Sequence, residues 1–247
     1  MDVRLTVVGS SPAWPNPGGA QSGYLVEADG RRLLLDCGPG VIAKLRELDG
    51  GWPWVDAIAI THWHLDHWGD LVPWVWGNMV GPGKGKERPQ LWLPPEGRGR
   101  IRDFGARLGW DDMFDQTFEL HDYPEDEPFE AAGFTLLARR LPHYTLLTFG
   151  LRVTNGSHSL AYSGDTGPDA RLADLARDVD LFVCEATLER PELDGRPRGH
   201  LAAEEAIAAF DASGARRLLL THRPGELPLD DGLELARDGL VIEIGES

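Results

Sequence analysis

The segment Thr61-His62-Trp63-His64-Leu65-Asp66-His67 decides how the rest of this sequence is interpreted. It follows the apolar run Val55–Ile60, which predicts a buried strand. Because alternate residues of an extended segment point the same way, His62 and His64 can bind one metal ion together. Asp66 and His67 stand where a helix is expected to begin, so they can face a second ion. Imidazole and carboxylate suit Zn²⁺ and similar divalent ions, whereas a merely polar loop rarely carries four such residues at this spacing.

Composition limits the class of protein. The chain has 247 residues, of which 42% are apolar and 26% charged, as in a globular domain, and we expect one domain over residues 1–247. It has no run near the roughly 18 apolar residues of a membrane span and no signal-peptide pattern at its start. Cys37 and Cys184 lie in apolar runs far apart, so we expect buried, reduced thiols and a cytoplasmic location.

The formal net charge of −16 bears on partners. Such an acidic surface repels the backbone of a long nucleic acid. It does not exclude a small anionic substrate, because metal ions can reverse the sign of the potential inside a pocket.

Strand and helix patterns follow one another along the whole chain. Strands are expected at 4–8, 24–28, 31–36, 55–60, 91–93, 134–139, 148–154, 159–163, 180–184, 217–220 and 240–244. Helices are expected at 41–48, 66–79, 97–108, 170–177 and 201–212. Asn155-Gly156 predicts a hairpin, and Gly214 a helix end. Two similar halves of hairpins and helices predict an α+β fold of two mixed sheets packed face to face with outer helices.

Three more ligand-type residues stand at the ends of expected strands. They are His143 in Leu141-Pro142-His143, Asp165 in Ser163-Gly164-Asp165-Thr166, and His222 after the run 218–221. Each alone could be an ordinary turn or capping residue. In this order after His62-x-His64-x-Asp66-His67, however, they resemble the metallo-β-lactamase superfamily over nearly the whole chain.

The resemblance implies a four-layer αββα sandwich with the site at one edge, between the sheets. It implies a hydrolase with two divalent metal ions. Zn²⁺ is the default for this ligand set, and Mn²⁺ or Fe²⁺ would suit its two aspartates. The implied ligands are His62, His64 and His143 for one ion and Asp66, His67 and His222 for the other, with Asp165 bridging both.

Residues outside the ligand set bear on the reaction, because metal-activated water can attack either carbonyl carbon or phosphorus. A carboxylate bridge, Asp165, favours phosphorus. Gly199-His200-Leu201, at the expected start of a helix, resembles the Gly-His-Ser/Thr element of ribonuclease Z and related phosphodiesterases. The run 184–187, Cys-Glu-Ala-Thr, resembles the Glu-Ala-Thr strand end of the same group. The resemblance implies that His200 assists the leaving oxygen and that Glu185 orients it.

Two roles stay open at this point. Leu201 stands where Ser or Thr is usual, which puts the role of His200 in doubt. Asp66 could accept a proton from the nucleophile as well as bind metal.

The spacing of His143 and Asp165 bears on the substrate. Bacterial ribonuclease Z carries a long basic arm between these two ligands, and here only a pair of strands separates them. We therefore expect a small anionic phosphodiester, such as a cyclic nucleotide. The alternatives are a ribonuclease Z-like tRNA or RNA 3′-processing endonuclease, an acyl hydrolase (lactonase, thioesterase or lactamase) and a metal-binding protein without catalysis.

Several further features could serve the substrate or a partner. The loop 81–89 is either a basic lip of the pocket or a solvated loop, and the second reading is favoured. Trp63 and Trp68 flank the ligand motif and could line the pocket. Trp74 and Trp76 are expected in the core or in a dimer interface. The apolar segment Leu71–Met79 suggests a homodimer.

Overall fold

Two sheets form the centre of the protein in the computed structural model, which describes residues 3–227, 229 and 232–245. The strands of the first sheet are β1 (Val3–Gly9), β2 (Gly23–Ala28), β3 (Arg31–Leu35), β4 (Ala57–Ala59), β5 (Gln90–Leu93), β6 (Glu119–Asp122) and β13 (Val241–Ile244). Its order is β13-β1-β2-β3-β4-β5-β6. Strands β3 to β6 are parallel, and β1, β2 and β13 complete a mixed sheet through antiparallel pairs.

The second sheet is also mixed. Its strands are β7 (Pro128–Ala131), β8 (Phe134–His143), β9 (Leu146–Thr154), β10 (Ser159–Tyr162), β11 (Leu181–Glu185) and β12 (Leu218–Thr221). Its order is β12-β11-β10-β9-β8-β7, with β10, β11 and β12 parallel. The hairpin predicted at Asn155-Gly156 joins β9 to β10, and the Asn155 carboxamide oxygen accepts the Ser157 and His158 amides of the turn.

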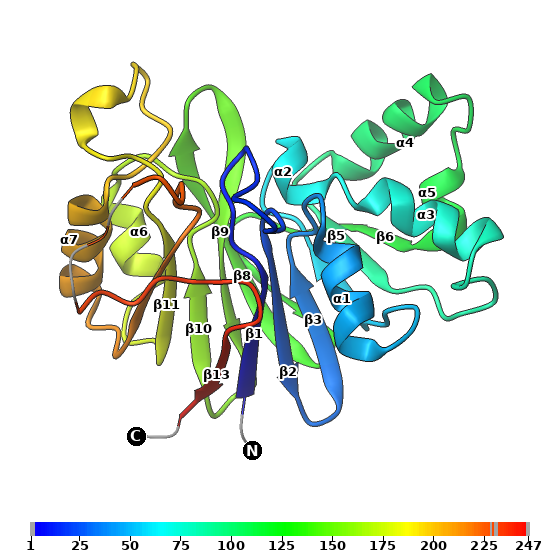
Figure 1. Ribbon diagram of the computed structural model, residues 1–247, viewed down its shortest axis with the longest axis horizontal. Coiled ribbons are helices and arrows are strands. Elements are labelled where there is room, and N and C mark those ends of the chain that lie inside the picture. Colours follow the sequence, from blue (N-terminus) through cyan, green and yellow to red (C-terminus); the bar gives the residue numbers. More distant parts are fainter. Residues whose placement is uncertain (1–2, 228, 230–231, 246–247) are drawn as a thin grey trace.

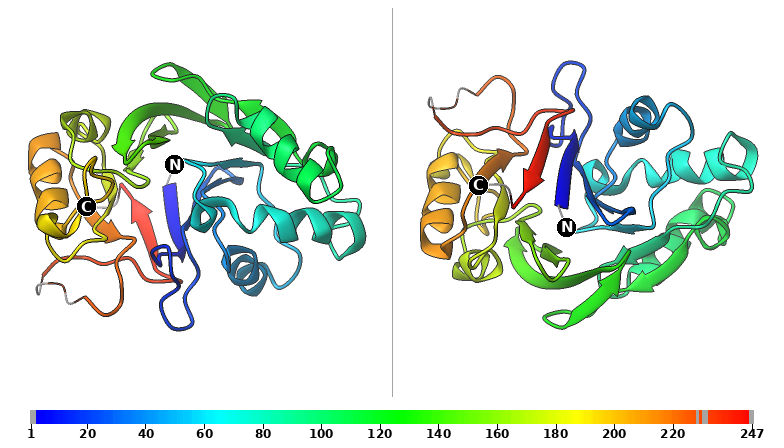
Figure 2. Two further views of the ribbon diagram at one scale, coloured as in Figure 1. Left: turned by 90° about the horizontal axis from the view of Figure 1, so that it is seen from above. Right: turned by 90° about the horizontal axis from the view of Figure 1, so that it is seen from below.

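Helices cover the outer face of each sheet (Figures 1 and 2). Those on the first sheet are α1 (Val41–Asp49), α2 (Leu65–Trp68), α3 (Leu71–Val80), α4 (Gly97–Arg107) and α5 (Met113–Thr117). Those on the second sheet are α6 (Ala170–Leu175) and α7 (Ala203–Ser213), with the 3₁₀ turn η1 (Pro191–Leu193) before α7. The four-layer αββα arrangement expected from the sequence is thereby confirmed.

The layers follow from the two-residue period of the strands. On β3, Leu33 and Leu35 enter the core between the sheets, whereas Leu34 packs under the outer helices. On β11, Leu181 and Val183 likewise face the central core, and Phe182 packs under α6 and α7. Both faces of these strands are buried, so their sequences are continuous apolar runs.

One predicted helix is wrong in its extent. The apolar stretch 66–79 is divided into α2 and α3 at Gly69 and Asp70. The Asp70 amide donates to the Cys37 carbonyl, 3.0 Å away, and its carboxylate accepts the Ile42 amide. These contacts with the segment after β3 replace intrahelical bonds, which no local pattern in the sequence could indicate.

Other differences are smaller. Helix α7 begins at Ala203, so Gly199-His200-Leu201 lies in the segment before the helix and does not open it. Helix α5 and strands β6 and β7 were not anticipated. Gly214 ends α7 in the left-handed conformation, as predicted. Both cysteines are buried and free, and among the described residues no helix is long and apolar enough to cross a membrane.

Candidate metal centre

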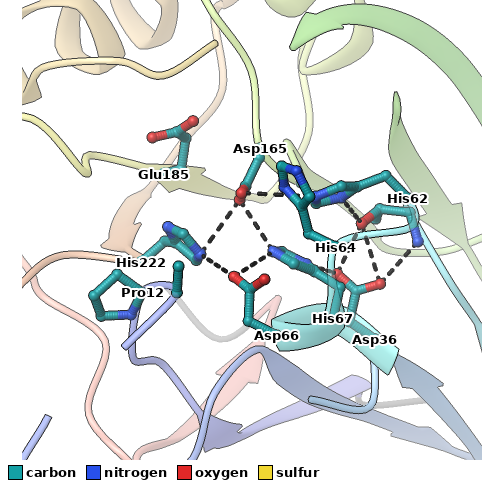
Figure 3. Close-up of polar contacts among 12 residues, drawn as sticks. Pro12, Asp36, His62, His64, Asp66, His67, Asp165, Glu185 and His222 are labelled. Atoms are coloured by element: carbon teal, nitrogen blue, oxygen red, sulfur yellow. Dashed lines mark hydrogen bonds and ion pairs between the residues drawn. The ribbon is translucent and has the colours of Figure 1, made fainter. Parts of the chain in front are cut away.

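The ends of four strands converge at one edge of the sandwich, the upper edge in Figure 1. The seven predicted ligands lie after β4, in and before α2, at the end of β8 and after β10 and β12. They are His62, His64, Asp66, His67, His143, Asp165 and His222. All seven side chains face one another between the two sheets, as Figure 3 shows for those it labels.

The ligand-type atoms fall into two groups, and each group lies within 4.8 Å. The first joins His62, His64 and His143 to Asp165, and the second joins Asp66, His67 and His222 to the same aspartate. The two carboxylate oxygens of Asp165 face different groups: Oδ1 lies 3.3 Å from His67 Nε2, and Oδ2 lies 3.8 Å from His62 Nε2. This is the arrangement of two ion sites with a shared carboxylate.

The donor set fits divalent metal ions. Within the described part of the chain, His62 Nε2, His67 Nε2 and Asp165 Oδ1 are fully buried and have no hydrogen-bond partner. Leaving such atoms unpaired in a folded protein is costly. Because they point at a common centre, a cation is the group that satisfies them together.

The other ring nitrogen of each buried histidine is held by the protein. His67 Nδ1 donates to Asp36 at 2.7 Å, and His143 Nδ1 donates to the Gly199 carbonyl at 2.6 Å. His62 Nδ1 meets the Thr61 hydroxyl, and His222 Nδ1 meets the Thr187 hydroxyl. With Nδ1 as donor in all four rings, Nε2 keeps a lone pair for metal, and the rings cannot rotate.

Asp36 is a site residue that the sequence analysis missed. It lies directly after β3, fully buried, and accepts hydrogen bonds from His67, from the Tyr162 hydroxyl at 2.9 Å and from Thr61. Its φ of 59° is in the left-handed region, which Asp tolerates better than most residues. A carboxylate ending a buried strand, in Leu33-Leu34-Leu35-Asp36, was the available signal, and the sequence analysis assigned it only to the strand 31–36.

Burial and charge set the protonation of the ligands in opposite directions. Burial lowers the pKa of His62 and of His143, so both rings stay neutral, the form that binds metal. Burial also disfavours charge on His67, but the carboxylates of Asp165 and Asp36 outweigh it and raise the pKa of that ring. Asp165 is buried too, yet His222 and His67 hold its pKa well below the usual range. A cation would take the place of the proton on His67.

His200 and Glu185 form a second unit beside the ligands. His200 Nδ1 lies 2.9 Å from Glu185 Oε1, and the His200 ring is 4.9 Å from that of His143. Burial opposes charge on His200, but Glu185 outweighs it and raises the pKa of the ring to about 9. The predicted pair is therefore in contact, and His200 is an imidazolium at neutral pH. Atoms of Glu185, His200 and His222 that could bind a metal also lie within 4.8 Å of one another. The hydrogen bond between His200 and Glu185 accounts for part of this proximity.

Glu185 is connected to the metal centre through Thr187. The Thr187 hydroxyl donates to Glu185 Oε2 at 2.6 Å and accepts from His222 Nδ1 at 2.9 Å. The Leu201 amide also donates to Glu185, while its side chain is buried under α7. The residue that replaces the usual Ser or Thr thus places its side chain in the apolar core.

The segment before α7 is tied to the site by Asp194, which the sequence analysis also missed. Its Oδ2 accepts the amides of Gly199 and His200 at 2.8 and 3.0 Å. The Tyr144 hydroxyl also lies near Asp194, whose charge adds to burial in raising the pKa of that hydroxyl to about 12. No spacing in the sequence indicates these contacts.

Two expectations about the tryptophans were wrong. Trp68 is buried and packs on Phe104, and its indole donates to the Trp63 carbonyl. Trp63 makes an edge-to-face contact with Trp68, and both pack in the core between the first sheet and its helices. Because Trp63 alternates with His62 and His64, it points away from the ligands. Trp74 is in the core as expected, and Trp76 is partly exposed beside Trp110.

The loop 81–89 does not border the metal centre. Its residues 86–89 line a cavity of about 580 Å³ together with Arg31, Asp56, Gln90 and Glu119. These four residues lie at or just before the starts of β3, β4, β5 and β6, whereas the ligands follow strand ends. The solvated-loop reading therefore holds, and the basic-lip reading is wrong.

The geometry is matched by a family model. The model of the Beta-lactamase superfamily domain matches residues 31–223, which include all seven candidate ligands. The chain belongs to the beta-lactamase superfamily.

Related proteins align with most of the length of this chain. An uncharacterised protein of Mycobacterium tuberculosis is 34% identical over 96% of this chain and 86% of its own. A probable metallo-hydrolase of Bacillus subtilis, YhfI, is 29% identical over 90% and 87% of the two chains. Ribonuclease Z of Myxococcus xanthus is 27% identical over 98% of both. These relatives place the chain among the metallo-hydrolases of the beta-lactamase superfamily.

Solved structures agree with the fold. The crystal structure of Bacillus subtilis YhfI superimposes with a TM-score of 0.81 at 25% identity, covering 97% of this chain and 99% of that one. A diphosphatase of the PhnP family superimposes with a TM-score of 0.76 at 21% identity, covering 98% of each. The second likeness supports the beta-lactamase superfamily fold alone.

Proposed function

We propose that this protein is a dinuclear metal-dependent phosphodiesterase acting on a small substrate such as a cyclic nucleotide. His62, His64 and His143 would hold one divalent ion, and Asp66, His67 and His222 the other, with Asp165 shared. Zn²⁺ is the expected metal, with Mn²⁺ or Fe²⁺ as alternatives. The bound ions would supply Lewis acidity toward a phosphoryl group.

The observation that carries the proposal is the contact between His200 and Glu185 beside the ligands. Glu185 occupies Nδ1 of His200, which leaves Nε2 as the nitrogen available to a substrate. An imidazolium at this place can donate a proton to the leaving alkoxide of a phosphodiester. Because an alkoxide is a poor leaving group, its protonation by His200 is the step that the side chains of this protein would accelerate most.

The electrostatics of the pair support that role. Glu185 accepts from Thr166, Thr187 and His200 and is fully buried, so its carboxyl group is held facing His200. The carboxyl group of Glu185 raises the pKa of His200 to about 9, which favours the protonated ring at neutral pH. Asp66 Oδ2 lies 3.2 Å from His222 Nε2, which places the carboxylate for metal binding and for taking a proton from the attacking water.

The short segment between the candidate ligands His143 and Asp165 bears on the size of the substrate. His143 ends β8, and Asp165 follows β10, so only β9, β10 and two short turns separate them. The segment 143–165, all of which the structure describes, contains no inserted arm that could bind a tRNA. The net charge of −16 also opposes a long polyanion. Both observations favour a small substrate over the 3′-processing activity that the name of the ribonuclease Z relatives suggests.

The test compares two substrates that differ in leaving group. The zinc- or manganese-loaded protein is assayed on 3′,5′-cyclic AMP and on bis-p-nitrophenyl phosphate, with Asp165→Ala as the inactive control. His200→Ala should lower kcat on cyclic AMP by roughly 10²- to 10⁴-fold and affect the reporter much less, because p-nitrophenolate leaves without protonation. His121→Ala is the matched control, since His121 stacks on Trp92 away from the site.

Other outcomes assign other functions. Turnover of the reporter alone directs the search to RNA 3′ ends and other phosphodiesters. Metal binding without turnover of either compound contradicts the proposal and moves lactones, thioesters and lactams to the front. The cytoplasmic location, the single domain and the homodimer stay predictions.

A further inference from the structure

Tyr144 occupies a place that the proposed reaction does not yet use. It directly follows the candidate ligand His143, at the turn between β8 and β9. Its ring centroid lies 4.9 Å from that of His143 and 5.6 Å from that of His200. The side chain is nonetheless 40% exposed. An aromatic ring is therefore open to solvent beside His200, the proposed proton donor.

The backbone at this position does not favour an aromatic residue. Tyr144 has a φ of 50°, in the left-handed region that suits Gly and Asn and penalises bulky side chains. The Tyr144 amide donates to the Arg198 carbonyl at 3.1 Å, which holds the turn in this shape. The ring is present despite an unfavourable backbone, which points to a use for the ring itself.

The ring is also held in place from one side. A Cβ atom on Gly199 would lie 2.4 Å from the Tyr144 ring, so a glycine is required there. The hydroxyl lies near Asp194, whose carboxylate accepts the amides of Gly199 and His200. The ring therefore packs against the segment that carries His200.

We infer that Tyr144 is a substrate-contacting residue that stacks on a flat aromatic group attached to the phosphodiester, as in a nucleotide. The inference rests on the proposed function, because it takes the phosphate to lie at the metal centre and the leaving oxygen at His200. A group linked through that oxygen then passes within reach of the ring. Stacking on one aromatic side chain is tolerant of base identity, so the inference covers nucleotides as a class.

Two further exposed apolar residues adjoin site residues in the sequence. Leu193 in η1 is 53% exposed and precedes Asp194, and Leu65 in α2 is 59% exposed and precedes Asp66. An exposed aromatic ring beside a strongly polar centre suits a ligand with a charged phosphate and an apolar body.

The test uses two ligands that differ only by a base. Binding of AMP and of ribose 5-phosphate to the zinc-loaded protein is measured by calorimetry, for the wild type, Tyr144→Asn and Tyr144→Phe. The wild type should bind AMP roughly 5- to 150-fold more tightly, as expected for one base–aromatic stack. The two ligands should bind equally to Tyr144→Asn, and Tyr144→Phe should keep the preference. Asn accepts the left-handed backbone, so this variant is expected to fold.

A matched control and kinetics complete the design. Trp76 on α3 is 43% exposed and remote from the ligands, so Trp76→Gln should leave the preference unchanged. On cyclic AMP, Tyr144→Asn should raise KM more than it lowers kcat. Equal binding of both ligands to the wild type, or a preference that persists in Tyr144→Asn, overturns the inference. If the preference behaves as expected but no phosphodiester is turned over, the proposed function fails and the stacking site stands.

Discussion

The substitution Asp36→Asn tests how much of the metal affinity depends on a residue that touches no metal. Asn has the shape of Asp and tolerates the left-handed φ of 59° at this position. The change therefore removes a charge and one acceptor without altering the backbone. Asp36 lies between His67 and Thr61, and Thr61 in turn meets His62.

The magnitude follows from the hydrogen bonds. His67 donates to Oδ2, and the Thr61 amide donates to Oδ1 at 2.8 Å. Whichever way the new carboxamide turns, its NH₂ group faces one of these N–H donors. A buried donor without an acceptor costs about 1–3 kcal/mol. For metal binding, loss of such a partner reduces affinity by roughly 10- to 100-fold, which equals about 1.4–2.8 kcal/mol.

Two assays separate these effects. Competition with a chromophoric chelator measures Zn²⁺ affinity, and thermal unfolding in chelator measures the stability of the metal-free protein. We expect affinity to fall by roughly 10- to 100-fold and Tm to fall by roughly 2–12 °C. Asp56→Asn is the control, because Asp56 accepts from Arg31 and from the Arg32 amide at the opposite end of β3. It should lower stability and leave Zn²⁺ affinity unchanged.

Unchanged Zn²⁺ affinity in Asp36→Asn would refute the reasoning, even if the protein were less stable. It would mean that His67 keeps its orientation without the carboxylate. Equal losses of affinity in the Asp36 and Asp56 variants would also refute it, since general destabilisation would then explain both.

Three further predictions concern the reaction and the packing. In a pH–rate profile, the rate on cyclic AMP should fall as pH rises through about 9, because His200 must be protonated to donate. In Glu185→Gln this alkaline fall should move toward the ordinary histidine pKa of 6.5. An alkaline fall at an unchanged pH would contradict the assignment. Leu201→Ser should lower the free energy of unfolding by roughly 2–4 kcal/mol without raising kcat, because the site is apolar and buried; a faster enzyme would show that the usual hydroxyl can act here. Gly77→Ala should destabilise by about 1–3 kcal/mol in denaturant titrations, since its Cβ would lie 1.8 Å from the Trp52 ring, and a more stable variant would contradict that packing.

The amino-acid sequence by itself determined the layer order and the candidate ligands. Apolar runs of strand length indicated buried strands, and ligand-type residues directly after several of them indicated one shared edge. The motif 61–67 is local, so its spacing alone predicted two ion positions. Asp165 stood out only in combination with that motif, because one carboxylate after a glycine is common in turns.

Only the tertiary structure decided what holds those ligands in place. Asp36 on the first sheet meets Tyr162 on the second across 126 positions of sequence, and Asp194 lies close to Tyr144 in a different loop of the second sheet. Helix 66–79 was divided for the same reason, because the Asp70 amide found the Cys37 carbonyl. Hydrogen bonds are directional and depend on which segments the fold brings together, whereas hydrophobic periodicity records only which face of an element is buried.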